Sequence, residues 1–321
     1  MQYRRLGNSG VKLSEISLGS WRSFGHSVDR AEAEKLIDFA YESGVNYYDT
    51  SDNYESGQAE RFIGSILRKY SRDSFVVGTK VCSITAPHAN GSGLSRKHIR
   101  DSCDASLKRL GLEYIDLYQC HRIDPETSMD ETLRTLDDLV RAGKILYYGI
   151  SHEFPDLGQV QDSVHTTERY GLHPIVSNQQ QYHLLDRRLE NEVMPYGASR
   201  GIGHLIYSPL AQGVLTGKYR PGKAEETESV RLSLGKGKVK RELSAWLSEE
   251  VLSRIEQLGE IAEEERVSLT QLTLAWTLSH PEVTSCIVGA SSVTQLDENI
   301  RASGIALSAE TVSRMEAIMT V

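Results

Sequence analysis

The chain has 321 residues, of which 39% are hydrophobic and 25% are charged, a balance that is ordinary for a globular enzyme. Its formal net charge of −8 at pH 7 argues against nucleic acid as the main partner, because a surface that binds phosphates needs concentrated Lys and Arg. No apolar run reaches the length that spans a membrane, and the amino terminus MQYRRLGNSG lacks the apolar core of a signal peptide.

The first residues predict a β-hairpin, in which QYRRL and VKLS flank a turn at GNSG. After it, short apolar strands alternate with helices of 3.6-residue periodicity. The expected strands cover residues 16–19, 45–49, 75–79, 114–119, 145–149, 175–179, 204–207 and 286–289. The expected helices cover residues 30–43, 58–69, 95–110, 129–142, 156–170, 190–199, a long tract after Glu249, and 293–302.

This alternation predicts parallel βαβ units. About eight units close most simply as a (β/α)8 TIM barrel, here with an added N-terminal β-hairpin and a C-terminal helix, in a single domain over residues 1–321. A doubly wound open sheet is the competing arrangement, but it would carry a Gly-rich fingerprint after the first strand, and GSWRSFGH is not one. Residues 86–95 and 211–245 interrupt the alternation, and loops of this kind on a barrel are usually functional.

Polar side chains stand at the carboxyl ends of the predicted strands, where a (β/α)8 barrel places its active site. Asp49 ends the second strand, and Tyr54 lies in the loop beyond it. Lys80 follows the third strand, and His121 follows the fourth. Each residue alone has an ordinary structural explanation, such as packing or a solvated charge. Their occurrence at three consecutive strand ends predicts that the fold brings them together.

These four side chains suit proton donation to a carbonyl group. A free tyrosine titrates near pH 10, and a nearby ammonium such as that of Lys80 is expected to lower its pKa. A carboxylate at Asp49 would hold the lysine in place, and His121 could donate a hydrogen bond to a carbonyl oxygen. The component that the residues cannot supply is a hydride, which requires a nicotinamide cofactor.

With these motifs, the chain resembles the aldo-keto reductases, and especially the branch that includes the β subunits of voltage-gated potassium channels and related bacterial reductases. The resemblance runs from YRRLGNSG near residue 3 to Ala302. The segments that carry it are DTSDNYESGQAE, TK after the third strand, GLSRKHIRDSCDASLKRLGLEYIDLYQCH, YSPLAQGVLTGKY and GASSVTQLDEN.

The resemblance implies a barrel that binds NADPH without a Rossmann fold and reduces a small-molecule aldehyde or ketone. It implies that Tyr54 is the general acid, that Lys80 lowers its pKa while paired with Asp49, and that His121 orients the carbonyl. The substrate pocket would be lined by Trp21, Tyr54 and His121. The cofactor residues would be Gly19, Ser20, Trp21, Asp49, Ser151, His152, Gln179, Tyr207, Ser208, Pro209, Leu210, Ala211, Gln212, Gly213, Lys218, Arg231, Gly289, Ser291, Gln295, Glu298 and Asn299.

Within this cofactor set, the resemblance places Ser151 and Gln179 at the nicotinamide carboxamide and Tyr207 against the nicotinamide ring. The segment after Tyr207 would surround the pyrophosphate, and residues 291–299 would hold the adenosine end. Gln295 stands where the family often has Arg or Lys near the 2′-phosphate, which leaves NADH as the less favoured alternative to NADPH.

The interrupting tract at 211–245 contains a basic stretch that we expect to fold over the bound dinucleotide as a lid. The opposing interpretation is a solvated loop. The basic residues are Arg231, Lys236, Lys238, Lys240 and Arg241.

Two functions fit the sequence. The first is an NADPH-dependent carbonyl reductase, which the complete set of four catalytic residues favours. The second is an NADPH-binding regulatory subunit that acts by contacting another protein.

The four cysteines contain no CxxC pair, so neither a metal site nor a redox dithiol is predicted, and a cytoplasmic location is expected. The sequence carries no signal for the oligomeric state.

Overall fold

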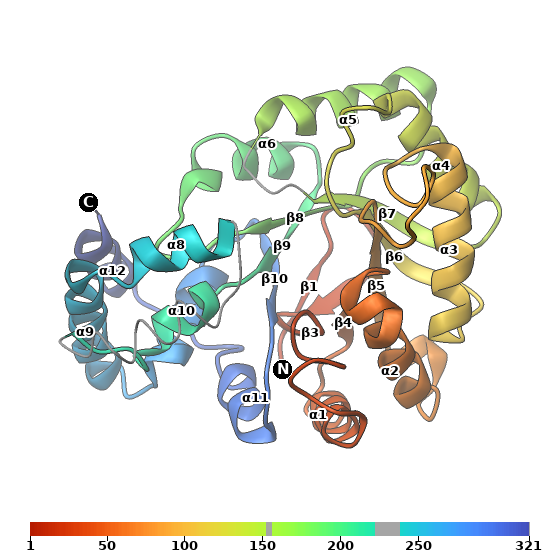
Figure 1. Cartoon of the computed structure of the whole chain (residues 1–321). Helices are drawn as coiled ribbons and strands as arrows, with labels where there is room; N and C mark the ends of the chain where they lie inside the picture. The colour runs from red at the N-terminus through yellow and green to blue at the C-terminus, as the bar shows by residue number, and fades with distance from the viewer. Residues whose placement is uncertain (152–155, 222–237, 321) are drawn as a thin grey trace.

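Parallel strands close into a barrel, and the predicted (β/α)8 architecture is confirmed. The computed structural model describes residues 1–151, 156–221 and 238–320, with the backbone alone for residues 238–240. In this part of the chain, eight strands join in the order β10-β3-β4-β5-β6-β7-β8-β9 (Figure 1). They are β3 (Ile16–Gly19), β4 (Tyr47–Asp49), β5 (Val76–Val81), β6 (Ile115–Cys120), β7 (Ile145–Ser151), β8 (Ser177–Gln181), β9 (Gly203–Tyr207) and β10 (Val283–Val288).

The predicted amino-terminal hairpin is present as β1 (Tyr3–Arg5) and β2 (Lys12–Ser14), which pair antiparallel. Within this hairpin, Leu6 and Leu13 are buried in one apolar cluster with strand residues such as Leu117 and Leu205. The hairpin therefore packs against the barrel strands, and burial of these leucines contributes favourably to folding.

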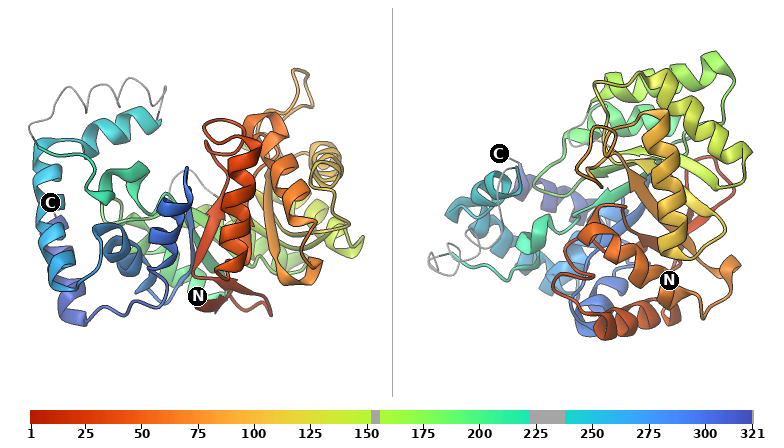
Figure 2. Two further views of the ribbon diagram at one scale, coloured as in Figure 1. Left: turned by 90° about the horizontal axis from the view of Figure 1, so that it is seen from below. Right: turned by 45° about the vertical axis from the view of Figure 1, so that its right-hand side comes forward.

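Helices surround the barrel, and most begin at a serine or aspartate cap, as at Asp29, Ser95 and Ser128 (Figures 1 and 2). They are α1 (Arg30–Glu42), α2 (Gln58–Leu67), α3 (Arg96–Leu110), α4 (Met129–Arg141), α5 (Leu157–Tyr170), α6 (Val193–Ser199), α8 (Lys238–Trp246), α9 (Glu249–Glu264), α10 (Leu269–Leu278), α11 (Val293–Ile300) and α12 (Ala309–Met319). Short 3₁₀ turns are η1 (Tyr54–Gly57), η2 (Arg72–Ser74), η3 (Arg188–Glu190) and η4 (Ala211–Thr216).

Most element boundaries differ from the sequence prediction by one or two residues, and three differences are larger. The last strand begins at Val283 rather than at residue 286, because the polar Ser285 is buried and donates to the carbonyl of Ser14. The helix expected from residue 190 begins at Val193, after the separate turn η3. The tract after Glu249 divides into α9 and α10, where Ser268 and Gln271 form a capping box that begins the second helix.

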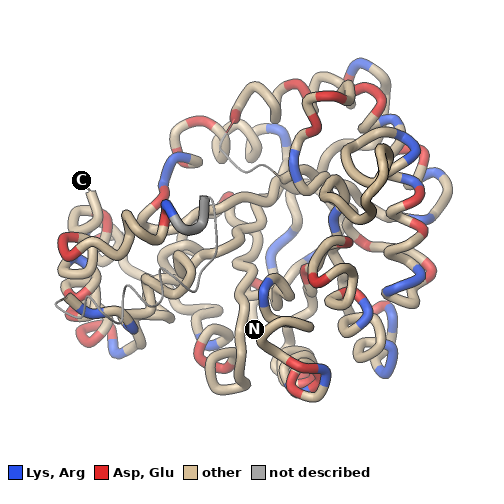
Figure 3. The backbone as a smooth tube through the Cα atoms, in the orientation of Figure 1, with Lys and Arg blue, Asp and Glu red and all other residues tan. Residues whose placement is uncertain are grey.

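Lys and Arg alternate with Asp and Glu along the surrounding helices in the view of Figure 3. This pattern differs from the basic stripe that a nucleic-acid surface requires. In the described ranges, no helix combines the length and the hydropathy needed to cross a membrane.

Candidate active site

A buried ion pair lies at the carboxyl ends of β4 and β5. Nζ of Lys80 is 2.5 Å from Oδ1 of Asp49 and donates a second hydrogen bond of 2.8 Å to the carbonyl of Thr50. Both charged side chains are almost completely buried. The pairing predicted from the sequence is therefore present, because adjacent parallel strands bring their last residues to one edge.

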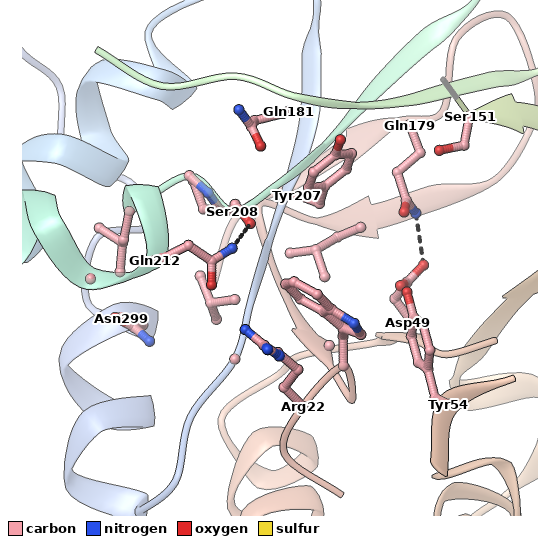
Figure 4. A pocket seen from close by; sticks show the side chains of 18 of the residues that line it. Arg22, Asp49, Tyr54, Ser151, Gln179, Gln181, Tyr207, Ser208, Gln212 and Asn299 are labelled. Atoms are coloured by element: carbon pink, nitrogen blue, oxygen red, sulfur yellow. Dashed lines mark hydrogen bonds between the residues drawn. The ribbon is translucent and has the colours of Figure 1, made fainter. Parts of the chain in front are cut away.

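Two further side chains complete the surroundings of Asp49. Oδ2 accepts a 3.1 Å hydrogen bond from the Tyr47 hydroxyl. It also accepts a 2.7 Å bond from Nε2 of Gln179 (Figure 4). Each carboxylate oxygen therefore has a donor, as a buried charge requires. Gln179, which the sequence assigned to the nicotinamide carboxamide, contacts Asp49 in this structure.

A left-handed turn positions Tyr54 beyond β4. Glu55, Ser56 and Gly57 have φ angles of 46°, 54° and 80°, a conformation that reverses the chain directly after the tyrosine. Nζ of Lys80 lies 5.1 Å from the centroid of the Tyr54 ring. The phenol, the ammonium and Asp49 thus form one compact group at the rim of the barrel.

The pKa of Tyr54 differs from the sequence expectation. Burial raises the pKa of the phenol well above its usual value of 10, and the negative charges of Asp49 and Asp52 raise it further. The expected lowering by Lys80 was wrong for this state, because the ammonium is already paired with Asp49 and its positive charge is largely balanced. Tyr54 consequently keeps its proton at neutral pH.

His121 faces Tyr54 from the end of β6. The two ring centroids are 5.7 Å apart in an edge-on arrangement with an interplanar angle of 72°. Nδ1 is 3.0 Å from Oγ of Ser51, so one ring nitrogen is held by the protein. Burial, followed by the charges of Lys80 and Arg122, lowers the pKa of His121 to about 3. The imidazole is therefore neutral at working pH.

A second group of buried charged residues lies near Tyr54 and His121. Glu60 accepts hydrogen bonds from Arg109 and, at 2.6 Å, from Oγ1 of Thr79. Asp52 is 2% exposed, and its Oδ2 has no hydrogen-bond partner. Burial, followed by the negative charge of Glu60, raises the pKa of Asp52 to about 7. The sequence analysis did not single out these residues.

A cavity of about 860 Å³ opens above the four residues expected to be catalytic. Tyr54, His121 and Asp49 line it directly, whereas Lys80 lies beneath, behind Asp49. Figure 4 shows Tyr54 and Asp49 on one side of this cavity and Gln212 and Asn299 on the other. The space is large enough for an extended ligand of drug or cofactor size.

The loop after β9 has the backbone conformation of an anion site. Ser208, Ala211, Gln212 and Gly213 have positive φ angles of 53°, 47°, 57° and 87°. Successive residues in this region form concavities of backbone N–H groups that bind anions. Nε2 of Gln212 donates a 2.8 Å hydrogen bond to Oγ of Ser208, which closes the loop on itself (Figure 4). Together with Lys218 at the cavity wall, these residues suit a phosphate-bearing cofactor.

Most of the residues assigned to the cofactor and substrate meet at this cavity. Those that line it are Gly19, Trp21, Asp49, Tyr54, His121, Ser151, Gln179, Tyr207, Ser208, Pro209, Leu210, Gln212, Gly213, Lys218, Gly289, Gln295, Glu298 and Asn299. Ser20 and Ala211 are buried away from it, and Ser291 is exposed outside it, where its N–H and hydroxyl donate to Gln295. These three are not among the residues that line the cavity.

Three residues named in the sequence analysis lie outside the described residues, namely His152 and, in the basic tract, Arg231 and Lys236. Of the remaining basic residues, Lys238, Lys240 and Arg241 belong to α8, and Arg241 is exposed. The same helix brings Glu242 to the cavity wall. The proposed lid is not tested by the part that is described.

The sequence analysis missed a further group of cavity residues, which are Arg22, Asn53, Ser83, Arg122, Gln181, Thr216, Glu242, Thr270, Ile287 and Val288. Some had a local signal. Arg122 directly follows His121, and Gln181 lies two residues past Gln179 on the same face of its strand. Others, such as Thr270 and Glu242, come from helices that only the folded barrel brings close. In the described ranges, no cluster of three or more His, Cys, Asp or Glu is arranged to hold a metal ion.

Comparison with known proteins adds an independent observation. Residues 15–320 match the protein family described as "Aldo/keto reductase family". The chain is 36% identical to a probable voltage-gated potassium channel subunit beta of Arabidopsis thaliana, over 94% of this chain and 91% of the relative. It is 37% identical to the L-glyceraldehyde 3-phosphate reductase of Escherichia coli (strain K12), over 94% of this chain and 87% of that one. The chain is 35% identical to a putative voltage-gated potassium channel subunit beta of Schizosaccharomyces pombe, over 94% of this chain and 87% of that relative.

Proposed function

Because the chain belongs to the aldo/keto reductase family of oxidoreductases, we propose that it reduces aldehydes or ketones to alcohols, with NADPH as the hydride donor and Tyr54 as the general acid. The observation that carries this proposal is the meeting of Asp49, Lys80, Tyr54 and His121 at the floor of one cavity. Three consecutive strands supply them, and the cavity continues into a loop suited to phosphate.

The residues of this corner can move one proton to a carbonyl oxygen. Tyr54 keeps its proton at neutral pH, since burial raises its pKa, and it gives that proton up when negative charge develops on the carbonyl oxygen. Lys80, 5.1 Å from the ring centroid, stabilises the phenolate that remains. His121 is neutral and has one ring nitrogen held by Ser51, which leaves the other for the carbonyl oxygen.

The residues that we assign to the cofactor line the same cavity. Ser151, Gln179 and Tyr207 would hold the nicotinamide, and the loop from Ser208 to Gly213 with Lys218 would hold the pyrophosphate. Residues Gln295, Glu298 and Asn299 at α11 would contact the adenosine end. NADP is proposed over NAD on the resemblance alone, since Gln295 supplies no positive charge for a 2′-phosphate.

A second candidate is a regulatory subunit that binds NADPH and acts through a partner protein. It is favoured by the similarity to proteins named as potassium channel β subunits. The relative named as an L-glyceraldehyde 3-phosphate reductase favours the enzyme. The presence of Tyr54, Lys80, Asp49 and His121 in one group supports the reductase as the first candidate, because binding alone does not require a proton donor.

The test is a fluorescence titration with NADPH and, separately, NADH, followed by cofactor oxidation with a panel of aldehydes and ketones. Tight NADPH binding with turnover on at least one carbonyl supports the reductase. Tight binding without turnover on the whole panel favours the regulatory subunit. Failure to bind either nucleotide contradicts both candidates.

A further inference from the structure

We infer that the substrate of this site is a short aldehyde that carries an anionic group, phosphate or carboxylate, and that Arg122 binds this group. The inference rests on the proposed reductase function and names its substrate class. Its starting point is the position of Arg122, which directly follows His121 and lines the same cavity.

Arg122 is fixed close to the reacting corner. Consecutive Cα atoms are about 3.8 Å apart, so its backbone lies one residue from the imidazole that faces Tyr54. Its guanidinium lies close enough to the Cys82 thiol for its charge to oppose the effect of burial, which raises the pKa of that thiol. The side chain is exposed and its charge lowers the pKa of His121. An anion bound there would be only a short distance from the carbonyl.

The charge of Arg122 is not balanced by a carboxylate. Its acidic neighbour Asp124 accepts hydrogen bonds from the N–H groups of Leu94 and Glu126 and from Oγ1 of Thr127. In the described ranges, no carboxylate lies within the 4.0 Å of Arg122 that defines an ion pair. Asp124 therefore holds the neighbouring loop rather than the guanidinium.

The charged residue at the end of each of the two neighbouring strands is already paired. Asp49 and Lys80 form a closed ion pair, and His121 is neutral. Arg122 is therefore a positive charge of the cavity wall, adjacent to His121 in the chain, that this ion pair does not neutralise. A guanidinium can bind a phosphate or a carboxylate through two parallel hydrogen bonds, which provides geometric selectivity as well as affinity.

The remaining cavity residues of this corner are also polar. Asn53 and Ser83 line the cavity, and Oγ of Ser83 is 3.5 Å from Nδ1 of His121. Trp21, 41% exposed, adds an aromatic surface to the same cavity. This composition favours a small polar aldehyde over a long aliphatic one, in agreement with an anionic group at Arg122.

The test compares pairs of aldehydes that differ in charge. Glyceraldehyde 3-phosphate is measured against glyceraldehyde for the phosphate, and succinic semialdehyde against its methyl ester for the carboxylate. The quantity is the ratio of kcat/KM for the charged member to that for the neutral member, in wild type, Arg122→Gln and Arg122→Lys. NADPH affinity is measured for each protein.

We expect the wild type to prefer the charged member of one pair, and the stronger preference identifies phosphate or carboxylate. Arg122→Gln should lower this ratio about 10- to 100-fold, mainly through KM, and Arg122→Lys should retain part of it. The matched control is Arg68→Gln, which makes the same change in net charge at an exposed arginine that caps the end of α2. It should leave the ratio unchanged.

Turnover without a preference for either charged aldehyde would overturn the inference while leaving the reductase intact. A fall in NADPH affinity in Arg122→Gln as large as the fall in the ratio would also overturn it, because Arg122 would then bind the cofactor. Absence of turnover on all four aldehydes would contradict the reductase itself, and the inference would fall with it.

Discussion

Gly78 and Tyr47 face each other inside the barrel so closely that a Cβ atom at Gly78 would lie 2.2 Å from the Tyr47 hydroxyl. That hydroxyl donates to Asp49, the residue that holds Lys80. The missing side chain at residue 78 therefore leaves the space in which a tyrosine can support the buried carboxylate. The glycine acts on the active site through one intermediate side chain.

Gly78→Ala should destabilise the protein by about 1–3 kcal/mol, because the added methyl group forces Tyr47 away from Asp49. Thermal or urea unfolding measures the loss. The double variant Tyr47→Phe/Gly78→Ala should recover part of it, since the closest atom is removed. Gly259→Ala is the control, because a Cβ atom there meets nothing within 4 Å and lies inside α9. An equal loss in both alanine variants would contradict the packing argument.

Lys80→Met should remove about 3–5 kcal/mol of stability, because it leaves the carboxylate of Asp49 buried without its counter-charge. Adding Asp49→Asn to this variant should recover much of the loss, since the unpaired charge is then gone. Denaturant unfolding measures the coupling free energy between Lys80 and Asp49. The proteins compared are the wild type, both single variants and the double variant. Strictly additive effects would show that the 2.5 Å contact carries no energetic link.

Asp52 should make stability depend on pH. Burial raises its pKa to about 7 in the folded protein, against about 4 when unfolded, so the native state binds this proton more tightly. Its contribution to stability is therefore full below about pH 4 and is lost as the pH rises towards 7 and above. Asp52→Asn cannot ionise, so relative to wild type it should gain on the order of 2–4 kcal/mol between pH 4 and pH 8.

The control for this pH series is Asp162→Asn, at an exposed carboxyl on the outer helix α5. Its stability difference from wild type should be nearly the same at both pH values. A flat difference for Asp52→Asn as well would mean that Asp52 is ionised in the folded protein throughout this range.

His121 should remain uncharged through the physiological range. Burial, Lys80 and Arg122 lower its pKa to about 3, whereas a free imidazole titrates near 6.5. Its ring NMR signals, assigned by their absence in His121→Gln, should not shift between pH 5 and pH 8. A titration of these signals in that range would show that the imidazole carries a proton when the substrate arrives.

Much of the site was predictable because strand order and strand direction are simple. Asp49, Lys80 and His121 follow three consecutive parallel strands, and such strand ends necessarily meet at one rim. The state of Tyr54 was not predictable in this way. Its pKa depends on how deeply the phenol is buried and on whether the charge of Lys80 is already paired, and neither is visible in the residue order.

The missed residues have a similar explanation. Arg122 and Asn53 border residues that were assigned, but a loop residue can point to solvent or into the cavity, and no periodicity distinguishes the two. Glu242 and Thr270 come from helices far along the chain. Ser285 gives the corresponding example for the fold. This polar residue is buried inside β10, so the apolar pattern of the sequence places the start of that strand too late.

Tyr54→Phe tests the central claim most directly. The substitution removes the phenolic proton and keeps the ring, so NADPH affinity should stay within about threefold while kcat for carbonyl reduction falls by about 10²- to 10⁴-fold. Tyr3→Phe is the control and should leave kcat unchanged, because it removes a hydroxyl that donates to the Gly44 carbonyl, and neither residue lines the cavity. Near wild-type kcat in Tyr54→Phe would contradict the assignment of Tyr54 as the proton donor.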